Sequence, residues 1–292
     1  GNNWRFDLFV SRRSALILQL MPKIDERFFR RDFLTVAFLA VIAAAAILYT
    51  HKLTTNPAGF YIDESSIAYN AHLIAQTGRD EHGEAWPLYF RAFGDYKNPV
   101  YVYLLAAIFK VTGPSIKVAR LLSATLGFTT ALLIGLLAWR ITKRREAVLV
   151  VTLTAFLTPW LFELSRVVVE VALYPLLIAL LLLVVHSIST KEKWSWLETL
   201  ALAFTLALLT YAYSIGRVLA PLLALGLLAF LSRARLVSIL KAWLLYGVSL
   251  IPLLVFQQRH PGALSARYQL ITFITPQTSY LEDAREFVRH YL

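Results

Sequence analysis

Long apolar runs separated by short polar connectors dominate the pattern along the chain. After residue 32 these runs recur with few charged residues inside them. A helix needs about 20 mostly apolar residues to cross the hydrocarbon core of a bilayer. The pattern therefore predicts an all-α protein, a polytopic transmembrane helix bundle with about seven spans. The expected spans are residues 33–49, 118–139, 146–164, 167–188, 194–213, 215–231 and 242–257.

One apolar run, residues 99–111, is too short to be another span. It ends at Lys110 and a following Gly-Pro pair, and we expect a helix that lies at the outer surface. The basic clusters support this topology. Lys and Arg gather at 140–145, 191–193 and 233–241, and such clusters mark cytoplasmic loops. Residues 99–111 then cannot cross, and the first long loop faces outside.

The same pattern divides the chain into three parts. We expect residues 1–32 to be a cytoplasmic interfacial segment whose arginines face anionic lipid. Residues 33–257 form a transmembrane domain that includes a long outer loop, residues 50–117, with surface helices. Residues 258–292 form a further outer loop. Because no terminating signal closes the chain, we expect it to be the front part of a longer protein.

Composition supports a membrane protein and excludes an ordinary soluble domain. Hydrophobic residues make up 58% of the chain and charged residues only 16%, and the mean hydropathy is +0.60. Soluble domains carry about 25% charged residues. The net charge of +11 would suggest nucleic acid in a soluble protein. Here the basic residues lie in the loops between the expected spans, as in other membrane proteins, so we expect no nucleic-acid partner. The chain has no cysteine.

The longest polar interval, residues 59–99, is the first place to look for chemistry. It opens with Asp63 and Glu64, which begin a helical pattern that Gly78 would end. From the spacing alone, the favoured alternative is that Asp63 is only the N-cap of a helix over residues 64–77. Capping and catalysis are compatible, because a capping carboxylate is held in a fixed position.

Two further groups lie in the same interval. Asp80 and Glu81, near a histidine and a third acid, could hold a divalent metal, but no spacing here is diagnostic and a solvated turn around Gly83 is the favoured interpretation. Asp95, Tyr96 and Lys97 precede a Pro-initiated helix. Lys97 would then lie near a helix N-terminus, where an anion is favoured. The alternative is a lysine that snorkels beside an aromatic belt.

Four ionisable residues fall at the predicted outer ends of the spans, where such groups are costly and are usually paired or functional. Arg166 and Glu170 are four residues apart and could simply pair with each other. Arg120 and Arg217 could reach lipid headgroups. Tyr211 fits an aromatic belt as well as a substrate wall. One outer-facing cavity would collect all of these side chains.

The order and spacing of the loop motifs resemble those of a known family. The motifs are GFYIDESSIAYNA, GRDEHGEAWPLYF, DYKNPVYVYL and then VARLLSATLG at the second span. They resemble the bacterial branch of the dolichyl-phosphate-mannose protein mannosyltransferases, glycosyltransferase family 39 of the GT-C superfamily. The lipid A aminoarabinose transferases are more distant relatives. The resemblance covers roughly residues 30–260.

The resemblance implies a GT-C-like fold and an inverting transfer. A sugar, mannose-like, would pass from a polyprenyl-phosphate donor to an acceptor hydroxyl on the outer face. In that scheme Asp63 is the general base and Glu64 its neighbour in the acceptor or donor site. Lys97, in the position of the family's Lys before Pro, binds the donor phosphate. Arg120, which matches the Arg before Leu-x-Ser-Ala, and Arg166 support the loop and the phosphate.

The remaining polar residues would line the substrate cavity. These expected lining residues are Asp80, Glu81, Asp95, Tyr96, Glu170, Tyr211 and Arg217. No cofactor is required, and a divalent metal stays open. The later spans and the large outer domain of the family are missing from this chain, so the acceptor could be a protein, a lipid or a glycan.

The residue types suit this chemistry independently. Displacement at an anomeric carbon has an oxocarbenium-like transition state, and a carboxylate must take the acceptor proton. The leaving phosphate gains charge, which a Lys or Arg would stabilise. No Gly-rich phosphate loop is present. The expected location is the cytoplasmic membrane, with several spans and with the active site facing outside.

Two other functions remain as alternatives. A transporter of lipid-linked sugars would need polar groups near the midplane, and the middles of these spans are nearly uncharged. A non-catalytic membrane subunit that retains a GT-C fold is the second alternative, and the sequence does not separate it from an enzyme.

Overall fold

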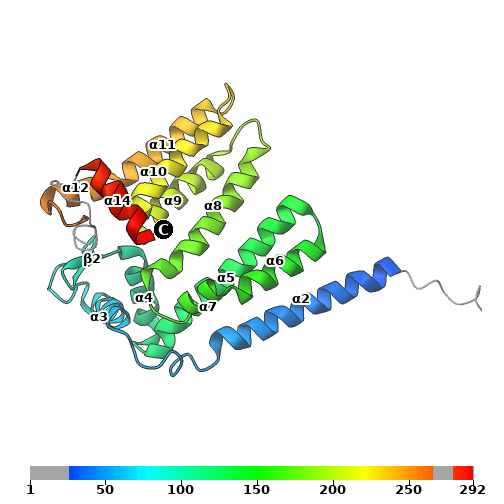
Figure 1. Cartoon of the computed structure of the whole chain (residues 1–292), viewed down its shortest axis with the longest axis horizontal. Helices are drawn as coiled ribbons and strands as arrows, with labels where there is room; N and C mark the ends of the chain where they lie inside the picture. The colour runs from blue at the N-terminus through cyan, green and yellow to red at the C-terminus, as the bar shows by residue number, and fades with distance from the viewer. Residues whose placement is uncertain (1–25, 266–278, 292) are drawn as a thin grey trace, which may run out of the picture. The chain divides into compact units, whose positions relative to one another are not determined.

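A computed structural model describes residues 26–265 and 279–291 of the chain (Figure 1). Residues 1–44 form one unit and residues 45–292 a second. The expected interfacial segment lies largely outside the described residues. The elements are α2 (Glu26–Thr50), α3 (Ile62–Thr77), β1 (Phe90–Ala92), β2 (Asp95–Lys97), α4 (Pro99–Thr112), α5 (Ile116–Thr142), α6 (Arg145–Leu157), α7 (Pro159–Leu164), η1 (Glu170–Leu173), α8 (Tyr174–Ser189), α9 (Trp196–Ala212), α10 (Gly216–Gly226), η2 (Leu227–Phe230), α11 (Leu236–Ser249), α12 (Ile251–Arg259) and α14 (Tyr280–Tyr291).

Within the second unit, helix pairs that are neighbours in sequence pack against each other. Helix α5 contacts α6 and α8, and α9 contacts α8, α10 and α11. Figure 1 shows α3, β2 and α4 at one end of this bundle, and the α5–α6, α8–α9 and η2–α11 connections at the other. The Arg235 guanidinium ties two of those connections together, because it donates to the carbonyls of Ser189 and Lys191 at 3.0 and 2.8 Å.

Four helical segments in the described part of the chain are long and apolar enough to cross a membrane. They are Asp32–Thr50, Ile116–Thr142, Glu170–Ser189 and Leu236–Arg259. Helices α4, α9 and α10 with η2 are apolar but shorter. The protein is therefore a helical membrane protein, and the count of seven spans stays a prediction. The expected short helix is present as α4, and its place at the outer surface stays a prediction.

Two of the expected spans have different bounds. Residues 146–164 were expected as one helix, but the backbone is extended at Thr158 and the chain divides into α6 and α7. Pro159 causes this break, because a proline disfavours helical backbone at the preceding residue. The last span begins at Leu236, not at residue 242, and contains Lys241. Its ammonium lies 5.9 Å from the centre of the Trp196 ring, a favourable place for a cation.

The purely helical prediction also missed a β-hairpin. Strands β1 and β2 pair antiparallel, with Phe90 opposite Lys97 and Ala92 opposite Asp95. The two turn residues, Phe93 and Gly94, both have positive φ angles, of 53° and 78°. This is the backbone that two-residue hairpins of type I′ require. The hairpin holds Lys97 at the point where the chain enters α4.

Helix α3 packs on α4 and carries the first acidic pair. It was expected over residues 64–77 and runs from Ile62 to Thr77. Gly78 ends it in a left-handed conformation, and its N–H donates to the Ile74 carbonyl at 3.0 Å, so the predicted end is confirmed. Ile67, Ala71 and Ile74 are buried in a core shared with α4. Their burial leaves the first turn of α3 facing the hairpin and η1.

A close approach of α5 and α6 depends on one glycine. Gly135 of α5 lies against Thr152 of α6, and a Cβ atom added at Gly135 would overlap the Thr152 hydroxyl. That hydroxyl is buried and has no hydrogen-bond partner. The contact therefore rests on shape alone.

We expect Gly135→Ala to lower the stability of the protein by about 1–3 kcal/mol, the usual cost of overpacking. Thr152→Ala in the same chain should restore much of the loss, because it removes the overlapping atom. Gly247→Ala is the matched control, since nothing lies within 4 Å of a Cβ atom there. Thermal unfolding in detergent, followed by tryptophan fluorescence, measures all of these variants. Equal unfolding temperatures for Gly135→Ala and Gly247→Ala would contradict the prediction.

Candidate active site

Asp63 lies in the first turn of α3 and forms an ion pair with Lys97. The N-cap of the helix is Tyr61, so the expectation that Asp63 is the cap was wrong. The side chain of Asp63 is 34% exposed and that of Lys97 is 10% exposed. The carboxylate is thus held by a cation while one side of it stays open.

Lys97 reaches this position from the end of β2, two residues before the Pro99 that opens α4. It is buried, which contradicts the alternative of a lysine that snorkels to the surface. Pro99 occupies the first turn of α4, as expected. The pair forms because α4 packs against α3 and because the hairpin brings β2 to the start of α4.

Glu64, the next residue of α3, points into the interior and makes a buried pair with Arg120 of α5. Arg120 Nε donates to Glu64 Oε2 at 3.0 Å, and Nη2 donates to Oε1 at 2.8 Å. The N–H groups of Tyr61 and Val168 donate to the same carboxylate at 3.0 and 2.9 Å. Both side chains are about 1% exposed or less. Every part of this carboxylate therefore serves the fold.

Burial by itself raises the pKa of Glu64. The hydrogen bonds from Arg120, Tyr61 and Val168, together with the charge of Arg120, more than offset that effect, so the net pKa lies below the ordinary value. Glu64 is thus held in its charged form, as a buried carboxylate with several donors should be.

Arg120 and Arg166 both fasten the segment between α2 and α3. Arg120 donates to the carbonyls of Leu53, Pro57 and Gly59 at 2.9, 2.8 and 2.6 Å. Arg166 holds four carbonyls in the same region, those of Leu48, Tyr49, His51 and Asn56, at 3.2, 3.4, 2.7 and 2.7 Å. The expected support of the loop is present. Phosphate binding by these two arginines stays a prediction.

Glu170 does not pair with Arg166, so that alternative was wrong. Its carboxylate accepts from both the backbone N–H and the side-chain amide of Asn98. Arg217 of α10 donates to the Asn98 side-chain oxygen at 3.1 Å and lies 5.0 Å from the centre of the Tyr89 ring. Lys97 interacts electrostatically with Glu170. Residues from α3, β2, η1 and α10 therefore meet around residues 97 and 98.

The other expected lining residues make their hydrogen bonds elsewhere. Asp80 is buried and accepts from the N–H groups of His82 and Glu84 at 2.9 and 2.8 Å, as in a tight turn. Glu81 exchanges hydrogen bonds with Asn70. In the described ranges, no three His, Asp or Glu side chains are grouped so as to hold a metal. The metal site that we considered at this turn stays a prediction.

Asp95, Tyr96 and Tyr211 lie around the same end of the bundle. The Asp95 carboxylate accepts from the N–H of Tyr96 at 2.7 Å. Tyr96 makes an edge contact with Phe256, with ring centres 5.4 Å apart. The Tyr211 hydroxyl donates to the Ser249 carbonyl at 2.7 Å. These contacts explain how the three residues are held, and their role as substrate lining stays a prediction.

Two residues of the network were missed at the sequence level. Asn98 joins Glu170 to Arg217, and its position before Pro99 in a polar loop was the available signal. Tyr89 is 1% exposed and its hydroxyl has no hydrogen-bond partner. Burial raises its pKa to about 12. Nothing in the local sequence distinguishes it from the other aromatic residues.

We expect Glu64→Gln to destabilise the protein by about 3–5 kcal/mol, because it leaves the buried Arg120 charge without its partner. Since the folded pKa of Glu64 is lowered, its stabilisation is present above the unfolded pKa. It is lost as the pH falls through the folded pKa. The wild-type unfolding temperature should therefore fall on acidification more steeply than that of Glu64→Gln. Parallel pH profiles, measured with the exposed Glu84→Gln as a control, would contradict this role.

One of the comparisons with known proteins identifies a family. A profile of the family described as Dolichyl-phosphate-mannose-protein mannosyltransferase matches residues 96–257. No curated protein and no solved structure matches the chain. The matched region contains Lys97, Asn98, Arg120, Glu170 and Arg217, and it covers more than half of the 292 residues. The chain therefore belongs to the family of dolichyl-phosphate-mannose-protein mannosyltransferases, membrane glycosyltransferases of the GT-C type.

Proposed function

We propose that the protein transfers a mannose-like sugar, with inversion, from a polyprenyl-phosphate donor to an acceptor hydroxyl. Asp63 is the general base and Lys97 binds the donor phosphate. The ion pair between these two residues is the observation that carries the proposal. It places a partly open carboxylate and a cation side by side, which are the two groups that the reaction needs.

The backbone around the pair favours an anion. Lys97 lies just before the N-terminus of α4, a helix of 14 residues, and Asp63 lies in the first turn of α3. Helix N-termini carry partial positive charge and free N–H groups. A phosphate that reaches Lys97 would therefore meet the Lys97 ammonium and also the partial positive charge at the N-terminus of α4.

The chemical step balances with these two residues alone. The acceptor oxygen forms a bond to the anomeric carbon, and the bond from that carbon to the phosphate oxygen breaks. The acceptor proton passes to the Asp63 carboxylate. The leaving polyprenyl phosphate keeps the electron pair, and the Lys97 ammonium stabilises the charge that it gains.

In the absence of donor, the ion pair occupies Asp63, and donor binding would release it. While Lys97 is bound to Asp63, its ammonium occupies a carboxylate oxygen that would otherwise be open to the acceptor hydroxyl. A donor phosphate that takes over the ammonium would free the carboxylate to accept a proton. Binding of the donor then activates the base, and the base stays paired when no donor is present.

The two other arginines are weaker candidates for the phosphate. The terminal nitrogens of Arg120 and Arg166 already donate to backbone carbonyls, and Arg120 also pairs with Glu64. Releasing either one would open the loop before α3. Arg217 is the better second cation, because among the described residues it donates to one backbone carbonyl only, that of Leu264 at 3.0 Å, beside its bond to the Asn98 side chain.

The basic connections support an outward-facing site. Lys143 and Arg144 lie between α5 and α6, Lys191 between α8 and α9, and Arg233 between η2 and α11. Figure 1 shows these connections at the end of the bundle opposite α3 and α4. Because basic loops face the cytoplasm, we place Asp63 at the outer face of the cytoplasmic membrane.

We expect Asp63→Asn to reduce transfer by about 10² or more, because a neutral amide cannot accept the proton. Its loss of thermal stability should be smaller than that of Glu64→Gln, since Asp63 is 34% exposed and Glu64 is 1% exposed. The assay uses a polyprenyl-phosphate mannose donor and a hydroxyl acceptor, with Glu84→Gln as the matched control. Near-normal transfer by a folded Asp63→Asn protein would remove Asp63 as the base. No transfer by the wild type with any donor would favour a non-catalytic subunit.

We expect Lys97→Ala to raise the donor KM or abolish turnover, because the leaving phosphate loses its cation. Lys97→Arg should rescue poorly, since a planar fork does not replace a compact ammonium. Lys117→Ala, an exposed lysine at the start of α5, is the control. Steady-state kinetics over donor concentration separate the effects on KM and kcat. If Lys97→Ala leaves the donor KM and kcat unchanged, Lys97 does not bind the donor phosphate, and Arg217 becomes the candidate for that role.

A further inference from the structure

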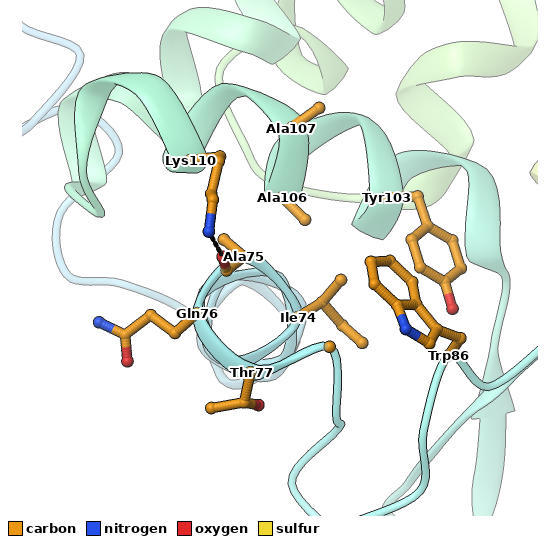
Figure 2. A pocket seen from close by; sticks show the side chains of 10 residues that line it. Ile74, Ala75, Gln76, Thr77, Trp86, Tyr103, Ala106, Ala107 and Lys110 are labelled. Carbon is orange, nitrogen blue, oxygen red and sulfur yellow. Dashed lines mark hydrogen bonds between the residues drawn. The ribbon is translucent and has the colours of Figure 1, made fainter.

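One cavity of the described chain lies away from the Asp63–Lys97 pair, and neither of these two residues lines it. It has a volume of about 410 Å³ and lies between the C-terminal end of α3 and the middle of α4 (Figure 2). Trp86, from the loop before the hairpin, forms one wall. The remaining lining residues are Ile74, Ala75, Gln76, Thr77, Gly78, Tyr103, Ala106, Ala107 and Lys110.

Trp86 is held rigidly although 67% of it is exposed. Its ring stacks on Tyr103 with an interplanar angle of 13°, and its backbone N–H donates to the Gly78 carbonyl at 2.9 Å. The Tyr103 hydroxyl fixes the next residue by donating to the Pro87 carbonyl at 2.7 Å. The backbone of Trp86 has a φ of 47°, which is unusual for a bulky residue. A residue that serves only as a membrane anchor needs none of these restraints.

The contact between Trp86 and Gly78 is equally specific. A Cβ atom added at Gly78 would lie 3.0 Å from the indole ring. Figure 2 shows the indole between Tyr103 and Ile74, with Gln76 and Thr77 pointing away from it. The wall of the cavity is therefore one face of an indole, opposite the apolar side of α3.

The electrostatics of the cavity disfavour an anion. It lies at the C-terminal end of α3, where the helix dipole is negative. The one cation in its lining, Lys110, already donates to the Ala75 carbonyl at 2.9 Å. A phosphate or carboxylate would meet the negative end of α3, and the Lys110 ammonium already gives one of its three N–H donors to the Ala75 carbonyl. A neutral ligand with hydroxyl donors does not meet this penalty.

We propose that this cavity binds one ring of a neutral glycan. The C–H face of a sugar ring is apolar and packs on the electron-rich face of an indole, and its hydroxyls remain free for carbonyls and water. The indole is held in place before the ligand arrives, so binding does not have to order it.

If the proposed function holds, the glycan is the acceptor, and the cavity holds a ring distant from the one that reacts. Asp63 and Thr77 are at opposite ends of α3, roughly 20 Å apart at 1.5 Å per residue. The acceptor would then be an extended chain of sugars, and this remote contact would help to position its reacting end.

The test measures the binding of linear α-linked mannotetraose to the full chain in detergent, by calorimetry. We expect Trp86→Leu to weaken binding by about tenfold or more, as the loss of a central tryptophan in a binding site does. Trp86→Phe keeps an aromatic face, so its affinity for mannotetraose should lie between those of the wild type and Trp86→Leu. Trp160→Leu is the matched control, because Trp160 is 58% exposed but lies on α7. Unfolding temperatures confirm that each variant is folded.

The outcomes distinguish a sugar site from a lipid site. Leu preserves apolar bulk, so binding of phosphatidylglycerol from mixed micelles should survive in Trp86→Leu. The proposal is overturned if mannotetraose does not bind the wild type or if Trp86→Leu binds it normally. It is also overturned if Trp86→Leu loses the binding of phosphatidylglycerol and not that of mannotetraose. Binding is measured without a donor, so it does not depend on sugar transfer. A wild type that binds mannotetraose but transfers no sugar would count against the proposed function alone, and a wild type that transfers sugar without binding mannotetraose would count against this proposal alone.

Discussion

The buried pair between Glu64 and Arg120 is the interaction on which the end of the bundle that holds α3 and α4 depends. Both charges are shielded from water, and removing one partner of such a pair is costly. Arg120 reaches from α5 to the loop before α3, and Glu64 also accepts from Val168. The pair thus fixes where α3 begins. Successive helix residues point about 100° apart, so fixing Glu64 inward also fixes where Asp63 points.

Residues 97 and 98 repeat the arrangement of residues 63 and 64, in which one residue is bound in the interior and its neighbour faces the candidate site. Lys97 pairs with the partly open Asp63, and Asn98 bonds to the buried Glu170 and to Arg217. In each case one residue is tied into the interior and its neighbour faces the candidate site. Two inward anchors therefore hold the groups that face each other in the site. This arrangement gives precision to a site built from loops and helix starts, which would otherwise be mobile.

The sequence predicted the features that depend on local pattern. Apolar runs located the long helices, Gly78 located the end of α3, and Pro99 the start of α4. The pairings were not accessible in this way, because they join residues 34 and 56 positions apart. Spacing even misled at Arg166 and Glu170. An i,i+4 pair requires a helix between them, and residues 167–169 are not helical. The hairpin was missed because its Phe-Gly turn is a weak signal.

The position of Arg166 has a consequence for how the chain is made. Its side chain holds four carbonyls that lie between 110 and 118 residues earlier in the sequence. A growing chain emerges from its N-terminus, and residue 166 appears only after the helices through α7 have been synthesised. The segment that leads into α3 must wait for it. The end of the bundle that holds α3 is therefore completed late, after the helices through α7 have been synthesised, and it can form only once those helices have packed correctly.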